Sequence, residues 1–210
     1  VKGNLTILSD NAKADGADTN MVQAIVTDAN SNRLQNVAVK FTATHGATVT
    51  TVSAMTNAQG EATTTLTNTQ SGVSSVTASI NNNNQMVDTT FIPDGGTATI
   101  ISGALVVTKD NAKADGADTN EVKATVTDAG GNHVPNAPVA FVADNGATVT
   151  TASAQTDIHG EASTTLTNVT AGISSVTASV NGNNQSVDTT FVADSGTGTI
   201  VKGNLTILSD

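Results

Sequence analysis

In the segment VAVKF at residues 37–41, large apolar side chains alternate with small or charged ones. Val37, Val39 and Phe41 share one side, and Lys40 lies on the other. A period of two is the mark of a β-strand with one buried face. The segment therefore predicts a strand whose Val and Phe side chains enter a hydrophobic core.

The same alternation recurs on either side of this segment and predicts further strands. The other inward-facing sets are Leu5/Ile7, Val22/Ala24/Val26, Ala62/Thr64/Leu66, Val76/Ala78/Ile80 and Val87/Thr89/Phe91, with a shorter strand at residues 47–51. Gly and Asn clusters between them, such as those at residues 14–16, 30–32, 45–46, 59–60 and 81–84, are typical of turns. About seven short strands in about 100 residues, with no helical period, indicate a two-sheet immunoglobulin-like sandwich.

The whole pattern returns after 100 residues. By direct comparison, 62 of the first 100 positions match their partners in residues 101–200, and residues 11–20 recur without change at 111–120. Tandem copies of this kind are typical of domain arrays. We expect an all-β protein with tandem Ig-like sandwiches end to end: domain 1 at residues 1–94, domain 2 at 97–194, and the first strand of a third repeat at 197–210.

The last ten residues carry a second, longer period. Residues 201–210 are identical to residues 1–10, but residues 101–110 match residues 1–10 at only three positions. This predicts a parent chain in which a two-domain cassette of 200 residues is duplicated.

Composition limits both the core and the partners. The four Phe residues are the only aromatic side chains, and there is no Cys, so the core must be aliphatic and without the disulfide of antibody domains. The lack of Cys does not identify the compartment. The net charge is −10, with no basic cluster, which argues against nucleic acid and anionic membranes as partners. No apolar run is long enough to span a membrane, so we expect no direct membrane insertion.

Two short polar segments mark the predicted domain boundaries. The first contains Pro93, Asp94, Gly95 and Gly96, and the second contains Asp194, Ser195 and Gly196. A strand-like segment at residues 97–108 follows the first one directly. Linkers this short cannot act as flexible tethers, so we expect limited bending between neighbouring domains.

An acidic cluster is the candidate metal site. It contains Asp10, Asp15 and Asp18, and it recurs at Asp110, Asp115 and Asp118. Calcium prefers six to eight oxygen ligands, which an acidic loop could supply near Asp15, Asp18, Asp115 and Asp118. The EF-hand pattern fails, however, and Asp beside Gly16 also fits ordinary turn chemistry. We therefore expect no cofactor, with calcium as the alternative.

Other reactive side chains form no recognisable constellation. His45, His133 and His159 occupy three different places in the repeat. Glu61 and Glu161 could in principle promote a Lys–Asn crosslink, but that chemistry needs a buried acid. Thr-rich faces without Trp or Tyr are poor sugar sites. The sequence predicts no catalytic residues and no enzyme.

Several segments together resemble one known family. They are ADG at residues 114–116, VKATVTD at 122–128, GNHVPNAPVAF at 131–141 and GEA at 160–162; the first copy keeps this frame but lacks the two prolines. The chain is similar to the bacterial Ig-like (Big-1 type) domains of the intimin/invasin outer-membrane adhesins, the inverse autotransporters. The resemblance implies a chain anchored by an outer-membrane barrel, extended by Ig-like repeats and ended by a distal binding domain.

These observations favour a structural role. We expect monomeric stalk repeats at the extracellular bacterial surface, anchored to the outer membrane through the parent chain, whose partners are the barrel and the distal adhesin domain of that chain. The alternative is that the repeats themselves bind a host receptor or self-associate between cells, as in biofilms. A third possibility is an accessory module of a secreted enzyme or a phage structural protein.

Overall fold

The computed structural model describes residues 4–203, which fall into two compact units. Unit 1 comprises Val1–Ala98 together with Thr127–Val134, and unit 2 comprises Thr99–Val126 together with Pro135–Asp210. The 127–134 loop thus belongs by sequence to the second repeat and by its contacts to unit 1. Among the described residues, no helix is long and apolar enough to cross a membrane.

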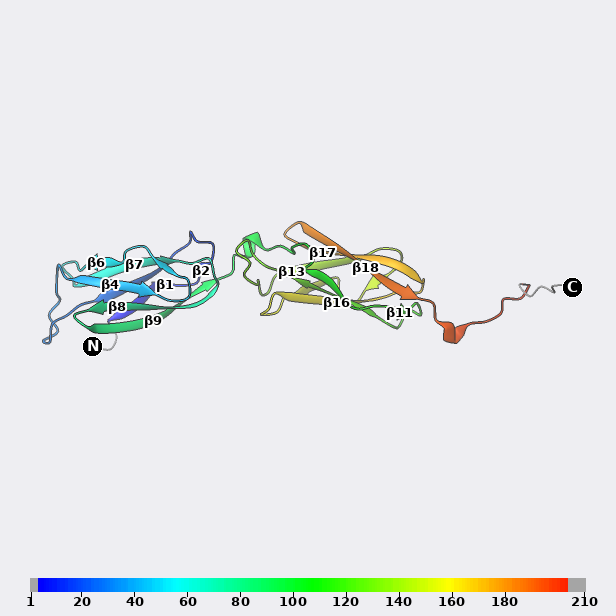
Figure 1. Cartoon of the computed structure of the whole chain (residues 1–210), viewed down its shortest axis with the longest axis horizontal. Coiled ribbons are helices and arrows are strands. Elements are labelled where there is room, and N and C mark those ends of the chain that lie inside the picture. The colour runs from blue at the N-terminus through cyan, green and yellow to red at the C-terminus, as the bar shows by residue number, and fades with distance from the viewer. Residues whose placement is uncertain (1–3, 204–210) are drawn as a thin grey trace. The chain divides into compact units, whose positions relative to one another are not determined.

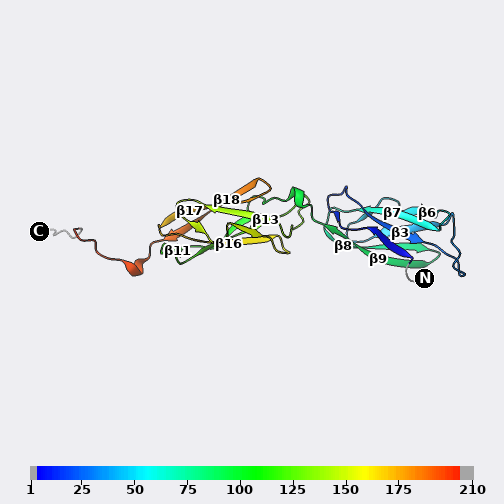
Figure 2. The same ribbon diagram turned by 180° about the vertical axis from the view of Figure 1, so that it is seen from behind.

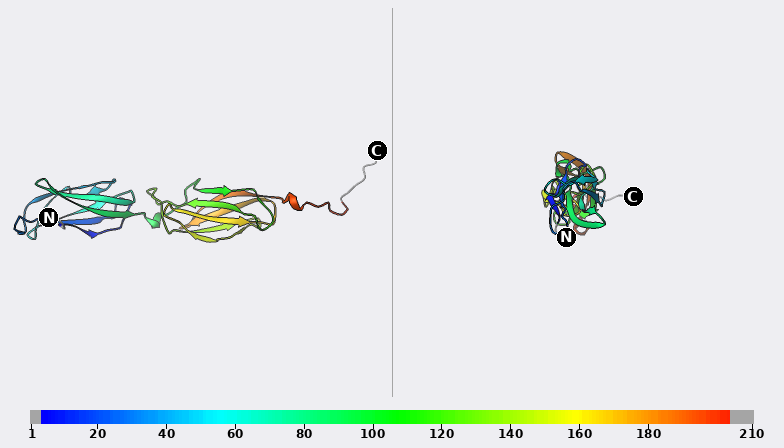
Figure 3. Two further views of the ribbon diagram at one scale, coloured as in Figure 1. Left: turned by 90° about the horizontal axis from the view of Figure 1, so that it is seen from below. Right: turned by 90° about the vertical axis from the view of Figure 1, so that its left-hand side faces the viewer.

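Unit 1 is a sandwich of two sheets (Figures 1 and 2). The four-stranded sheet has the order β1 (Leu5–Ser9), β3 (Asn20–Ile25), β7 (Glu61–Thr67) and β5 (Thr48–Val49). The five-stranded sheet has the order β2 (Ala12–Lys13), β9 (Asn83–Ile92), β8 (Gly72–Ile80), β4 (Ala38–Ala43) and β6 (Ser53–Met55). All neighbours are antiparallel except β2 and β9. The two layers are visible in Figure 3.

Unit 2 repeats this arrangement strand for strand. Its four-stranded sheet is β10 (Leu105–Lys109), β12 (Asn120–Thr125), β16 (Glu161–Thr167) and β14 (Thr148–Val149). Its five-stranded sheet is β11 (Ala112–Lys113), β18 (Asn183–Val192), β17 (Gly172–Val180), β13 (Pro138–Ala143) and β15 (Ser153–Gln155). A single 3-10 turn follows the last strand of each repeat: η1 (Gly95–Thr97) and η2 (Ser195–Thr197).

The core of each unit lies between the two sheets. In β4, Val39 and Phe41 are buried whereas Ala38 and Lys40 are exposed, as the alternation predicts. Phe91 from β9 is also buried in this core. Because apolar burial drives folding, each unit has its own source of stability. The predicted class, tandem all-β Ig-like sandwiches, is therefore confirmed.

Residues 5–13, and their equivalents 105–113, move the chain from one sheet to the other. β1 pairs with β3 in one sheet, and β2 pairs with β9 in the other. The change of direction occurs at Asn11, whose φ of 61° lies in the left-handed region that Asn tolerates better than most residues. The equivalent Asn111 has a φ of 62°.

A buried polar side chain holds this crossover in place. Asn20 is 0% exposed; its Oδ1 accepts the N–H of Ala12 at 2.9 Å, and its Nδ2 donates to the carbonyl of Thr90 at 2.8 Å. Beside it, Asp10 Oδ1 accepts from the Thr89 hydroxyl at 2.7 Å. Buried polar groups need such partners, so these residues cannot vary freely. This gives a physical reason for the unchanged decapeptide of residues 11–20 and 111–120.

Two expectations from the sequence were wrong. Residues 97–104 are not a strand: after η1 the next strand begins only at Leu105, because residues 101–104 form a turn in which the N–H of Ala104 donates to the carbonyl of Ile101 at 3.0 Å. Within residues 4–203 each unit has nine strands rather than about seven, because the short β2 and β6, and their equivalents β11 and β15, were not predicted. The predicted opening strand of a third repeat depends on residues 204–210, which lie outside the described residues.

Candidate functional site

The candidate site is the segment after β9, where the boundary of the first repeat was predicted. Asp94 starts η1: its Oδ1 accepts the N–H of Gly96 at 3.1 Å, and the Thr97 hydroxyl donates to its carbonyl at 3.1 Å. This is the hydrogen bonding of an N-cap residue, which satisfies free N–H groups at the start of the turn. The segment therefore has a defined local conformation in unit 1.

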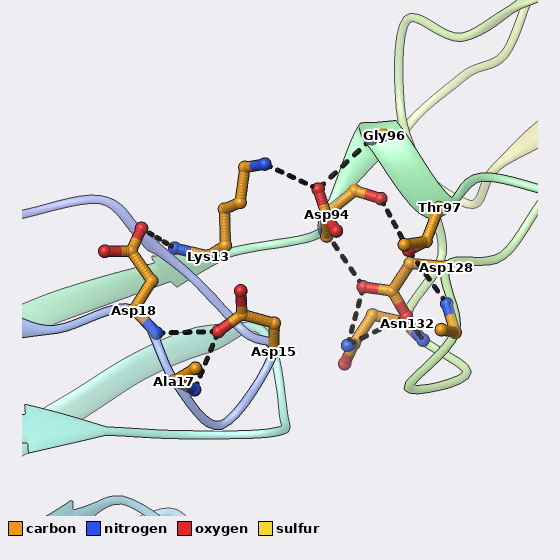
Figure 4. Close-up of polar contacts among 10 residues, drawn as sticks. Lys13, Asp15, Ala17, Asp18, Asp94, Gly96, Thr97, Asp128 and Asn132 are labelled. Atoms are coloured by element: carbon orange, nitrogen blue, oxygen red, sulfur yellow. Dashed lines mark hydrogen bonds and ion pairs between the residues drawn. The ribbon is translucent and has the colours of Figure 1, made fainter.

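A lysine from β2 adds an ion pair to this turn (Figure 4). Lys13 is paired in register with Ile92, the last residue of β9, so its side chain can reach Asp94 two residues further on. Its Nζ lies 2.9 Å from Asp94 Oδ1. The hydrogen bond from Lys13 holds the pKa of Asp94 below its ordinary value, against the opposing effect of burial. In unit 2, Lys113 Nζ lies 3.3 Å from Asp194 Oδ1 in the same arrangement.

The 127–134 loop completes the polar cluster of unit 1. Asp128 is 4% exposed, and its Oδ2 accepts the N–H of Asp94 at 3.0 Å. Asn132 Oδ1 accepts the N–H of Ser71 at 2.8 Å. The N–H of Ala129 donates to the Thr97 hydroxyl at 3.1 Å. Each of these three bonds uses a backbone group, so they fix the conformation of the chain here.

The predicted acidic cluster divides into two local structures. Asp10 turns to Thr89 and Thr90, as described above, while Asp15 and Asp18 remain in the loop after β2. Asp15 Oδ1 accepts the N–H groups of Ala17 and Asp18 at 2.8 and 2.7 Å. These bonds hold the pKa of Asp15 below its ordinary value. These local hydrogen bonds from backbone N–H groups to an Asp side chain are typical of turns, which the sequence offered as the alternative to a calcium site.

The second acidic loop has the same structure and one further ion pair. Asp118 Oδ2 accepts the N–H of Lys113 at 3.0 Å, and its Oδ1 lies 3.0 Å from Lys109 Nζ. These two interactions, the backbone one first, lower the pKa of Asp118 to about 2. Within residues 4–203, no three His, Asp or Glu side chains form a group suited to a metal ion.

The remaining candidates lie apart from one another. His45, His133 and His159 are all exposed and occupy three different turns or loops. Glu161 is partly exposed and pairs with Lys123 at 2.8 Å, and Glu61 accepts from Asn57 at 3.1 Å. Neither acid is buried, which a crosslinking role would require.

The fold and these contacts define a class: tandem Ig-like sandwiches with a capped turn after the last strand of each repeat. The family model for the bacterial Ig-like domain (group 1) matches residues 2–92 and again residues 102–192. The chain belongs to this family, which confirms the resemblance to the Big-1 domains of the intimin/invasin adhesins.

Individual relatives agree with this assignment. The inverse autotransporter adhesin YeeJ of Escherichia coli K12 is 35% identical over 184 residues, which cover 84% of the chain. The match spans 8% of the length of YeeJ. The solved structure of Yersinia pseudotuberculosis InvD is 24% identical, covers 94% of this chain and 61% of that one, and has a TM-score of 0.71. The Escherichia coli adhesin FdeC is 23% identical, with 90% and 63% coverage and a TM-score of 0.55. These two structures support the fold.

Proposed function

We propose that the chain is a non-enzymatic spacer of a bacterial surface adhesin. In this role its repeats project a distal binding domain away from the cell, and an outer-membrane barrel of the same parent chain anchors them. The observation that carries the proposal is the duplication itself: two complete Ig-like units of one family, each with its own core, in a chain related to an inverse autotransporter adhesin. Independent units in tandem add reach with every copy.

The turn after each repeat supports limited flexibility of the linker. Asp94 and Asp194 have the same capping bond to the N–H two residues later, and each is paired with a lysine from the strand beside it. A linker held in this way has fewer conformations than a Gly/Ser chain of the same length.

Most edge strands of unit 1 are short or irregular, although β2 pairs only with the last two residues of β9 and, among the described strands, leaves the rest of β9 without a partner on that side. Along the five-stranded sheet of unit 1 the edge strands are β2 with two residues and β6 with three, and in the other sheet β5 has two. The longer edge strand β1 is interrupted by a register shift between Ile7 and Ser9. Short or irregular edges discourage pairing with strands of another molecule.

A binding experiment separates this function from its main rival. The purified 210-residue chain is added over a concentration series to host cells, to matrix proteins and to immobilised copies of itself. We expect no saturable binding while circular dichroism shows a folded chain. Saturable binding to any of the three surfaces would instead assign adhesion to the repeats and refute the purely passive role.

A further inference from the structure

The segments after the last strand of each repeat have similar sequences, but the isoleucine in one is buried and the isoleucine in the other is exposed. η1 is followed by Thr99 and Ile100, and η2 by Thr199 and Ile200. A turn with a left-handed glycine comes next in both copies, at Gly103 (φ 83°) and Gly203 (φ 98°). Ile100, which belongs to unit 2, is 0% exposed, whereas Ile200 is 82% exposed.

The turn before β10 brings Ile100 back to the beginning of that strand. The N–H of Ala104 donates to the carbonyl of Ile101 at 3.0 Å, and the N–H of Thr125 donates to the carbonyl of Ala104 at 2.9 Å. Around this end of unit 2 the core side chains are closed to solvent. Their exposures are 0% for Ala124, Val126 and Ala178, and 3% for Val180.

The same end of unit 1 contains a cavity of about 110 Å³. We call it the pole cavity. Its lining is mostly apolar (Leu5, Ala24, Ile25, Val26, Val39, Ala78 and Ile80), with the polar Asn4, Thr27, Asn83 and Gln85 also lining it. These side chains are more open than their partners in unit 2: Val26 is 8% exposed and Ala78 7%, against 0% for both equivalents. The apolar part of this lining, next to the core of unit 1, favours an aliphatic side chain over water.

We propose that the pole cavity is the docking site for the segment TGTI, residues 197–200, of a second copy of this repeat pair. The sequence identifies the occupant. Residues 201–210 are identical to residues 1–10, so the tetrapeptide that precedes this ten-residue sequence elsewhere in the chain is Thr197-Gly-Thr-Ile200. Its counterpart at residues 97–100, TATI, leads into unit 2 and ends in the buried Ile100.

The contact joins successive repeats in one direction only. The exposed isoleucine at the end of one repeat fills the cavity at the beginning of the next, and the glycine turn supplies the short connection. Such an interaction is heterologous and does not close on itself, so it continues for as many repeats as the chain contains. The inference goes beyond the spacer proposal, since it holds whether the repeats are passive or adhesive.

The test adds the proposed docking tetrapeptide to the N-terminus of the complete 210-residue chain. One version carries Thr-Gly-Thr-Ile directly before Val1, and the matched control carries Thr-Gly-Thr-Asp. Methyl NMR follows Ala24 and Ala78, and calorimetry follows the unfolding of unit 1. Hydrogen exchange follows the N–H of Ile25, which donates to the carbonyl of Asn4 at 2.7 Å beside the cavity. Burial of one isoleucine should raise the unfolding midpoint of unit 1 by about 5–15 °C.

The expected result is specific to isoleucine. With Thr-Gly-Thr-Ile, the methyl signals of Ala24 and Ala78 shift, exchange at Ile25 slows and the midpoint rises; with Thr-Gly-Thr-Asp, all three stay at the values of the unextended chain. Equal behaviour of the two extended chains, whether both change or neither does, would overturn the docking proposal.

Discussion

Ile100 and Ile200 provide a matched pair of substitutions with opposite expected outcomes. Both become Ala, which removes three carbons from the side chain in each case. At Ile100, which is 0% exposed, the lost transfer free energy is about 0.8 kcal/mol for each carbon, or about 2.4 kcal/mol. The cavity left behind adds to this, and measured Ile→Ala losses in cores are about 2–5 kcal/mol. At Ile200, which is 82% exposed, the change should lie within about 0.5 kcal/mol.

Calorimetry and hydrogen exchange together show which of the two units loses stability in each variant. For a domain of about 100 residues, 1 kcal/mol corresponds to about 4–8 °C, so a loss of about 2–5 kcal/mol should lower one midpoint by about 8–40 °C. Exchange should accelerate in β10, β12 and β17 of unit 2 and remain unchanged in β3 and β8 of unit 1. Equal losses for the two variants, or a loss confined to unit 1, would refute the placement of Ile100 in the core of unit 2.

Three further predictions concern the polar framework and the acidic loops. Asn20→Ala should destabilise unit 1 by about 1–3 kcal/mol in urea unfolding, because the N–H of Ala12 and the carbonyl of Thr90 lose their partner; Asn120→Ala should do the same in unit 2, and an unchanged midpoint in either would contradict this role. The depressed pKa of Asp118, about 2 against 3.8 unfolded, contributes stability that is present above about pH 4 and lost as the pH falls towards 2. Urea unfolding from pH 6 to 2 should show this decline, and Asp118→Asn should make it less steep; an equally steep decline would contradict the assignment. Calcium followed by EDTA should leave both melting midpoints unchanged, and a rise with calcium that EDTA reverses would establish a metal site.

Alternation made the long strands predictable. Val39 and Phe41 in β4 and Ala62, Thr64 and Leu66 in β7 all face the core, because a strand with one buried face must alternate. The same reasoning misassigned residues 97–104. Ile100 is buried but does not belong to a strand. A pattern of apolar residues indicates which side chains are buried, and it does not show whether the backbone forms the hydrogen bonds of a sheet.

The elements that the sequence did not reveal are short or polar. β2 and β6 have two and three residues, which is too few to show any period. Asn20 looks like a surface residue but is completely buried, because two backbone groups from separate strands require its amide. The available signal for the role of Asn20 was its place in a decapeptide, residues 11–20, that recurs unchanged at residues 111–120.

The linker shows what local chemistry can and cannot predict. The segment after β9 was predicted only as a domain boundary, and its turn was not predicted; in the structure Asp94 caps η1. The ion pair with Lys13 was not predictable, because it depends on the parallel pairing of β2 with β9, some 80 residues apart in the sequence. The hydrogen bonds that Asp128 and Asn132 accept from backbone N–H groups likewise depend on the tertiary structure.

The most direct test of the spacer function is a measurement of reach. Chains with one, two and three copies of the 200-residue cassette are placed between a surface anchor and a fluorescent tip domain, and the height of the tip is measured by interferometric fluorescence on living cells. Ten-residue strands such as β9 span about 33 Å, so each repeat should add at least that height and the increments should be equal. A tip height that does not increase with copy number would contradict the account.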